Sequence, residues 1–248
     1  MYSGSSEIVE LLLSRGGDIE AGAGSEEGTP LYLAAWLGKS HLVESLIRHG
    51  AHVNVVGGLG RQPLQAACSW GFKAVAEKLL KSGADVNVSG GCDGSAICAA
   101  SNRGDEKLVS LLLECGASIN VADKYGWTAL HVASQCGHEN VAKVLLLRKA
   151  NINARTEDGL LALHLAAIRM HEEVVRLFLQ YEIAVYLDLA DILSAIDALE
   201  CSWDDFCENG EITDEDDIAH FTRVQDRAGT IWQLLFHAAA LVALPWDI

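Results

Sequence analysis

The chain has 248 residues, 50% of them hydrophobic and only 6% aromatic, and is long enough to bury a substantial core. Its formal net charge is −16, and most of that charge lies in residues 182–217, which contain 13 acidic and no basic side chains. Nucleic-acid binding requires clustered Lys and Arg. The composition therefore argues against a nucleic-acid partner.

The seven cysteines have no regular spacing, and an odd number fits a disulfide framework poorly, so a reducing compartment is expected. The first residues lack the basic and apolar regions of a signal peptide. The most apolar stretch, Ile231 to Leu244, is too short to span a bilayer and contains Gln233 and His237. These features predict an intracellular, cytoplasmic protein with no membrane partner, and leave the nucleus open as a location.

The first predicted element is a helix within about residues 4–22, where Ile8, Val9, Leu11 and Leu12 follow helical spacing. From about residue 24 onwards, one pattern recurs every 33 residues. An apolar residue is followed by an alanine and then by a glycine at fixed distances. The members are Leu31, Leu64, Ile97, Leu130 and Leu163; Ala34, Ala67, Ala100, Ala133 and Ala166; and Gly38, Gly71, Gly104 and Gly137.

Each repeated position has a physical reason. The alanine allows a neighbouring unit to approach closely, and the glycine can end a helix with a positive φ at no Cβ penalty. A second glycine, at positions 50, 83 and 116, ends the helix that follows. A helix pair this short cannot bury its apolar face alone, so the pairs must stack.

Three motifs then resemble ankyrin repeats: Thr29-Pro30-Leu31, Gly126-Trp127-Thr128-Ala129-Leu130-His131 and Gly83-Ala84-Asp85-Val86-Asn87. The resemblance covers about residues 4–182. It implies an all-α solenoid of stacked antiparallel helix pairs with projecting hairpin loops, and structural roles for His131 and His164. The predicted array at 1–183 comprises a leading half-repeat (4–22), four repeats (24–56, 57–89, 90–122 and 123–155) and a degraded fifth repeat (156–183), with Met170 and Glu182 where glycine is expected.

Two regions leave alternatives open. The leading half-repeat lacks a first helix, so the chain is either a fragment of a longer array or has a frayed start. Residues 184–248 are predicted to be an acidic, helical region that forms either degenerate repeats or a cap on the array.

The resemblance also implies that a partner protein binds the concave face and the hairpin tips. Trp, Tyr and Arg dominate interface energetics, and several occur at the free ends of first helices or in hairpins. The alternative is that these aromatic rings only pack on neighbouring loops. The candidate partner-binding residues are Trp36, Leu37, Leu59, Arg61, Ser69, Trp70, Asn102, Arg103, Lys124, Tyr125, Trp127, Gln135 and Arg169.

The predicted function is protein–protein interaction as an adaptor or scaffold, without cofactor, metal or catalytic residues. The alternative is a calcium-responsive regulator, since residues 205–216 resemble an EF-hand loop, with Asp205, Gly210 and Asp216 in the matching positions. Cys207 stands where a carboxylate belongs, and a thiol is a poor calcium ligand. A third hypothesis, an enzyme whose active domain lies outside this chain, has no support from a zinc spacing or a nucleophile motif.

Overall fold

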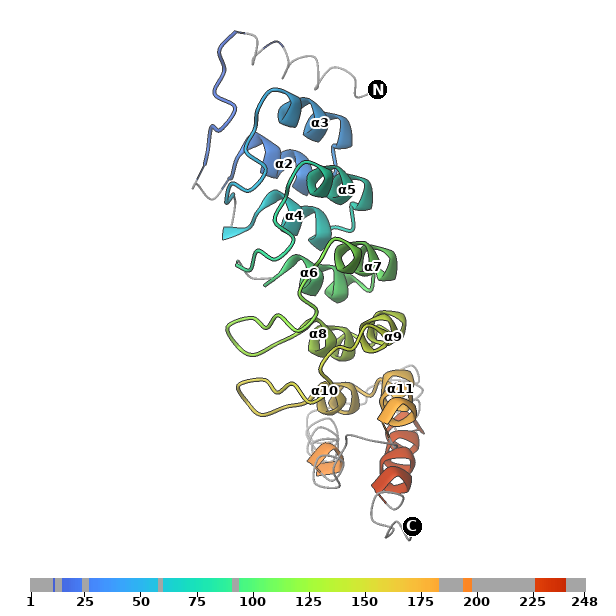
Figure 1. The fold of residues 1–248 in the computed structure, drawn as a ribbon. Coiled ribbons are helices and arrows are strands. Elements are labelled where there is room, and N and C mark those ends of the chain that lie inside the picture. The colour runs from blue at the N-terminus through green and yellow to red at the C-terminus, as the bar shows by residue number, and fades with distance from the viewer. Residues whose placement is uncertain are drawn as a thin grey trace, which may run out of the picture. The chain divides into compact units, whose positions relative to one another are not determined.

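The computed structural model describes residues 11, 15–23, 27–57, 60–90, 94–182, 194–197 and 226–239. The chain divides into two compact units, Met1–Lys124 and Tyr125–Ile248. Within each unit the labelled helices lie in neighbouring pairs (Figure 1). The described residues are helices and loops, with isolated β-bridge residues at Ser89, Ser95, Ala122 and Thr128. The prediction of an all-α fold is confirmed.

The first unit contains three described helix pairs. The first helix of each pair packs against the first helix of the next pair, and α3 likewise packs against α5. The pairs therefore stack, as the repeat pattern predicts. Their bounds are α2 (Pro30–Trp36), α3 (Ser40–Arg48), α4 (Pro63–Ser69), α5 (Lys73–Lys81), α6 (Ala96–Arg103) and α7 (Glu106–Glu114).

The second unit contains two more pairs: α8 (Ala129–Gln135) with α9 (Glu139–Leu147), and α10 (Ala162–Ile168) with α11 (Glu172–Glu182). Helix α8 packs against α10, and α9 packs against α11. Residues 194–197 and 226–239 are also helical, and Ile231 and Leu235 are fully buried. The predicted calcium loop at 205–216, most of the leading half-repeat and Leu59 lie outside the described residues.

Short helices need well-defined ends, and the repeat pattern supplies them. Thr29 Oγ1 accepts a hydrogen bond from the Tyr32 N–H at the start of α2, and Ser95 Oγ does the same for Cys98 at the start of α6. Gly104 ends α6 in the left-handed conformation at φ 73°. The alanine column of the repeat is at most 1% exposed, so the first helices pack closely across it: Ala34, Ala67, Ala100, Ala133 and Ala166.

Two side chains occupy left-handed positions where the repeat pattern places glycine: Lys149 at φ 65° and Met170 at φ 57°. A non-glycine residue in this conformation costs about 1–2 kcal/mol. The backbone is therefore strained after α9, at Lys149, and between α10 and α11, at Met170.

We expect Met170→Gly to raise the free energy of unfolding of the second unit by about 1 kcal/mol, because glycine adopts this φ without a Cβ clash. The check is urea unfolding followed by circular dichroism. Met170→Ala is the control, since it shortens the side chain but keeps the Cβ. Equal stabilities of the Gly and Ala variants would contradict this account.

Candidate partner-binding surface

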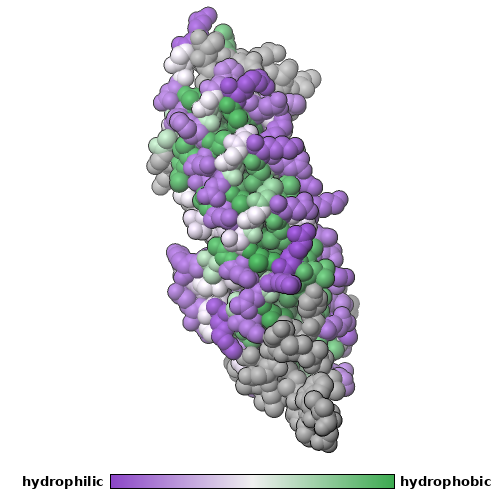
Figure 2. All heavy atoms as spheres, in the orientation of Figure 1, coloured by the Kyte–Doolittle hydropathy of each residue, from purple (hydrophilic) through white to green (hydrophobic). Residues whose placement is uncertain are grey.

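The ends of α2 and α4 bring together exposed apolar side chains in the first unit. Trp36 is 39% exposed, Leu37 53% and Trp70 48%. The two indole rings meet edge to face, with centroids 5.8 Å apart and planes at 86°. Each ring therefore touches the other and still presents a large surface to solvent. On the face drawn in Figure 2, hydrophobic residues are visible between hydrophilic ones.

Helix-end glycines set the positions of the neighbouring side chains. A Cβ on Gly38 would lie 2.7 Å from Phe72 Cε1, and a Cβ on Gly71 would lie 2.9 Å from Arg103 Nε. Because these glycines have no side chain, the next repeat's ring or guanidinium group lies directly against the backbone. Arg103 is thereby held beside the residue that follows Trp70.

Charged side chains are rare on the first helices of this unit. Helices α2, α4 and α6 contain a single charged side chain, Arg103, which is exposed at the end of α6. No described acidic side chain forms an ion pair with it. The nearest acidic residue along the chain, Asp105, accepts a hydrogen bond from the Leu108 N–H and caps α7.

Four other predicted residues of the first unit differ in their exposure. Asn102 and Lys124 are exposed, whereas Arg61 and Ser69 are half-buried. The Ser69 hydroxyl donates to the Gln65 carbonyl oxygen at 2.9 Å. Ser69 therefore has a structural contact in addition to its predicted role.

In the second unit, Tyr125 is 52% exposed and Arg169 is exposed just after α10. Trp127 is half-buried, with its ring centroid 6.2 Å from that of His131. The Gln135 carbonyl oxygen lies 2.9 Å from His171 Nε2. Trp127 and Gln135 thus contribute to packing within this unit, and Tyr125 and Arg169 are its more accessible candidates.

Two residues in one column of the repeat, His131 and Gln65, each link a first helix to the following hairpin, and the sequence predicted a structural role only for the histidines of that column. His131 Nε2 lies 3.2 Å from the Leu160 carbonyl oxygen. Gln65 holds the equivalent position, and its Nε2 donates to the Gly90 and Gly94 carbonyl oxygens. The role of Gln65 could have been predicted from the 33-residue spacing, which places Gln65 in the same column as His131.

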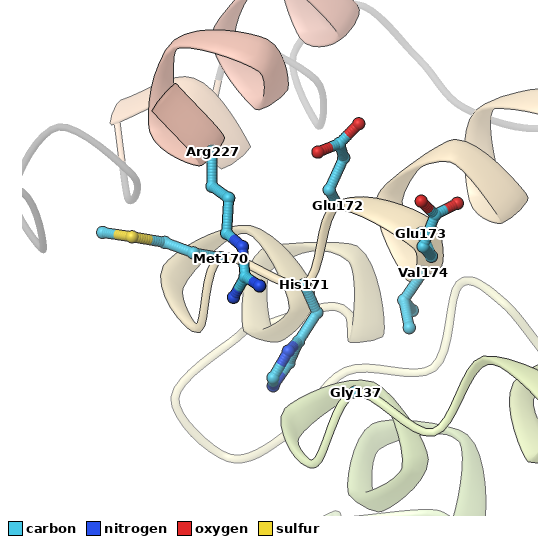
Figure 3. Close-up of a pocket in the computed structure, with 7 residues that line it drawn as sticks. All are labelled: Gly137, Met170, His171, Glu172, Glu173, Val174 and Arg227. Atoms are coloured by element: carbon cyan, nitrogen blue, oxygen red, sulfur yellow. The ribbon is translucent and has the colours of Figure 1, made fainter. Parts of the chain in front are cut away.

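A separate cavity of 280 Å³ lies at the start of α11 and is drawn in Figure 3. Burial lowers the pKa of His171. In Figure 3 the Arg227 side chain extends toward His171, whereas the carboxylates of Glu172 and Glu173 point away from it. The residues that line this cavity are Gly137, Met170, His171, Glu172, Glu173, Val174 and Arg227.

Three of the described thiols are poor nucleophiles because burial favours their protonated form. Burial raises the pKa of Cys68, Cys98 and Cys136, and the thiolate is the reactive form. Within the described ranges, no group of three or more His, Cys, Asp or Glu side chains is placed to hold a metal ion.

Comparison with known proteins agrees with the stacked helix pairs. A family model of ankyrin repeats in three copies matches residues 1–90 and 91–156, and a model of many copies matches residues 137–179. The chain belongs to the ankyrin-repeat family, whose repeats are generally protein–protein interaction modules. No curated protein matches the chain. Among the described helices, none is long and apolar enough to cross a membrane.

Proposed function

We propose that this chain is an intracellular adaptor or scaffold, without catalytic activity, that binds another protein through the ends of its first helices. The proposed centre of the interface is the Trp–Arg surface, defined as Trp36, Leu37, Trp70 and Arg103. The observation that carries the proposal is the pair of tryptophans, 39% and 48% exposed and in contact with each other, with Arg103 lying against the glycine that follows Trp70.

The energetics favour a binding role for these rings. A tryptophan at the centre of an interface can contribute about 2 kcal/mol or more, because a large rigid area loses contact with water. The core of the first unit is already built from buried side chains such as Leu31, Leu64 and Ile97, each 1% exposed. The exposed parts of Trp36 and Trp70 add little to that core.

Five other predicted residues form the proposed periphery. Arg61, Asn102 and Lys124 belong to the first unit, and Tyr125 and Arg169 provide exposed contacts on the second unit. Peripheral contacts of this kind exclude water and tune specificity more than they supply affinity.

We expect Trp36→Ala combined with Trp70→Ala to abolish partner capture and leave cooperative unfolding in place. Affinity purification followed by mass spectrometry, with wild type and variant in parallel, measures the first effect, and thermal unfolding measures the second. Leu147→Ala is a matched control, because it removes another exposed apolar side chain, 60% exposed, from the outer helix α9. Loss of cooperative unfolding would assign the two rings to the core and refute the proposal.

A further inference from the structure

We infer that the Trp–Arg surface binds an extended, acidic segment of the partner protein: an apolar side chain packs on the tryptophans, and a carboxylate about three residues away pairs with Arg103. This inference rests on the proposed function and specifies the chemistry of the partner.

The repeat sets the order of the side chains along the Trp–Arg surface. Leu37, Trp70 and Arg103 occupy the same position in three consecutive repeats, 33 residues apart. Their helices α2, α4 and α6 pack in that order. Packed helices lie about 8–10 Å apart, so the three side chains form a row that is apolar at one end and cationic at the other.

Arg103 forms the cationic end of this row. Arg103 is the only charged residue of the three first helices, and its guanidinium group lies against the Gly71 backbone. A guanidinium group presents a planar set of donors that matches a carboxylate with two parallel hydrogen bonds. The carboxylate of Asp105 is engaged at the start of α7. A carboxylate from the partner is therefore the complementary group.

Trp36, Leu37 and Trp70 form the apolar end of the row. The edge-to-face contact of Trp36 and Trp70 leaves parts of both rings open beside Leu37, which is 53% exposed. An aliphatic or aromatic side chain of the partner removes this surface from water at about 25 cal/mol per Å². A lysine or arginine in the partner, by contrast, would meet Arg103 as a like charge.

The distance between neighbouring repeats sets the spacing of the two side chains in the partner. One repeat corresponds to about 8–10 Å along the row, and an extended chain advances about 3.3 Å per residue. The apolar residue and the acidic residue of an extended segment are therefore about three positions apart. Peptide selection measures this spacing as the separation between the enriched apolar residue and the enriched acidic residue.

The test is selection of a displayed library of random dodecapeptides on the full chain, followed by fluorescence anisotropy with the enriched peptides. We expect enrichment of an apolar residue with Asp or Glu about three positions away. Arg103→Glu should weaken these peptides about 10-fold or more and, in a fresh selection, should enrich Lys or Arg at the acidic position. Lys81→Glu is the matched control, since it reverses an exposed charge on the outer helix α5 and should leave the selection unchanged.

The outcomes separate this inference from the proposed function. Peptides that lose binding in Trp70→Ala but carry no acidic preference would overturn the inference and leave the proposed function intact. Enrichment of phosphopeptides over carboxylate peptides in a parallel phosphoserine library would overturn the choice of a carboxylate. Peptides that are insensitive to both Trp70→Ala and Arg103→Glu, or a selection without enrichment, would count against both proposals.

Discussion

Gly126→Ala is expected to lower the free energy of unfolding of the Tyr125–Ile248 unit by about 2–4 kcal/mol. Gly126 has φ +79°, a conformation that costs a residue with a side chain about 1–2 kcal/mol. A Cβ there would also lie 3.0 Å from both the Arg155 carbonyl oxygen and the Thr156 Cα. These are backbone atoms that cannot rotate away, so one of the two loops must shift.

The contact involves more than one atom pair, because the Glu157 N–H donates to the Tyr125 carbonyl oxygen at 2.9 Å in the same place. A shift that accommodates the new Cβ therefore also disturbs this hydrogen bond. Tyr125, a candidate for partner contact, would move with its loop. Gly126→Ala is therefore expected both to lower the stability of the unit and to displace Tyr125.

Urea unfolding followed by circular dichroism measures the loss. Gly229→Ala is the control, because its Cβ would meet nothing within 4 Å and it lies in the helix at 226–239. Replacing a glycine inside a helix by alanine should stabilise by about 0.5–1 kcal/mol. If Gly126→Ala unfolded at the same urea concentration as wild type, the loop contact would be less constrained than the structure indicates.

The helix pairs could be predicted from the sequence because their stability depends on a periodic pattern. Leu64 and Ala67 lie one turn apart on the same helix face, and both are buried to within 1%. Burial of that face supplies most of the stability of such short helices. A pattern that repeats every 33 residues therefore predicts helix, turn and stacking together.

The geometry of the candidate surface could not be predicted in the same way. Trp36 and Trp70 are 34 residues apart and occupy adjacent rather than identical repeat positions. Their contact depends on rotamers, which have no periodic signature. The contact of Arg103 with Gly71 is likewise visible only in three dimensions.

Two candidate residues, Ser69 and Trp127, also make structural contacts. Sequence reasoning assigned Ser69 and Trp127 to partner contact because both fall in the family's variable positions. Ser69 also hydrogen-bonds to the backbone of its own helix, and Trp127 also packs on His131. A single side chain can serve both purposes, so these residues stay predictions for binding and acquire a structural contact.

Replacement of His131 is expected to have the second large effect on stability, because this buried side chain joins the start of α8 to the following hairpin. It is 1% exposed. Its Nδ1 accepts the Thr128 N–H at the start of α8 (3.2 Å), which leaves Nε2–H to donate to the Leu160 carbonyl oxygen. The imidazole thus fixes a helix start and the following hairpin at once.

His131→Leu should lower the free energy of unfolding of the second unit by about 2–4 kcal/mol, because each polar group left without a partner away from water costs about 1–3 kcal/mol. Urea unfolding again gives the value, and amide hydrogen exchange at Thr128 should accelerate. The hairpin around Leu160 is expected to loosen even where leucine fills the volume of the ring.

His131→Gln is the informative control, because the chain already uses glutamine for this purpose. Gln65 lies two repeats earlier, where its Oε1 accepts the Gln62 N–H at 2.8 Å and its Nε2 donates to the Gly94 carbonyl oxygen. Gly94 and Leu160 occupy the same position in their repeats. Glutamine at residue 131 should therefore keep both hydrogen bonds and retain most of the stability that leucine loses. Equal losses for the two variants would show that the imidazole ring contributes by packing and that its hydrogen bonds contribute little.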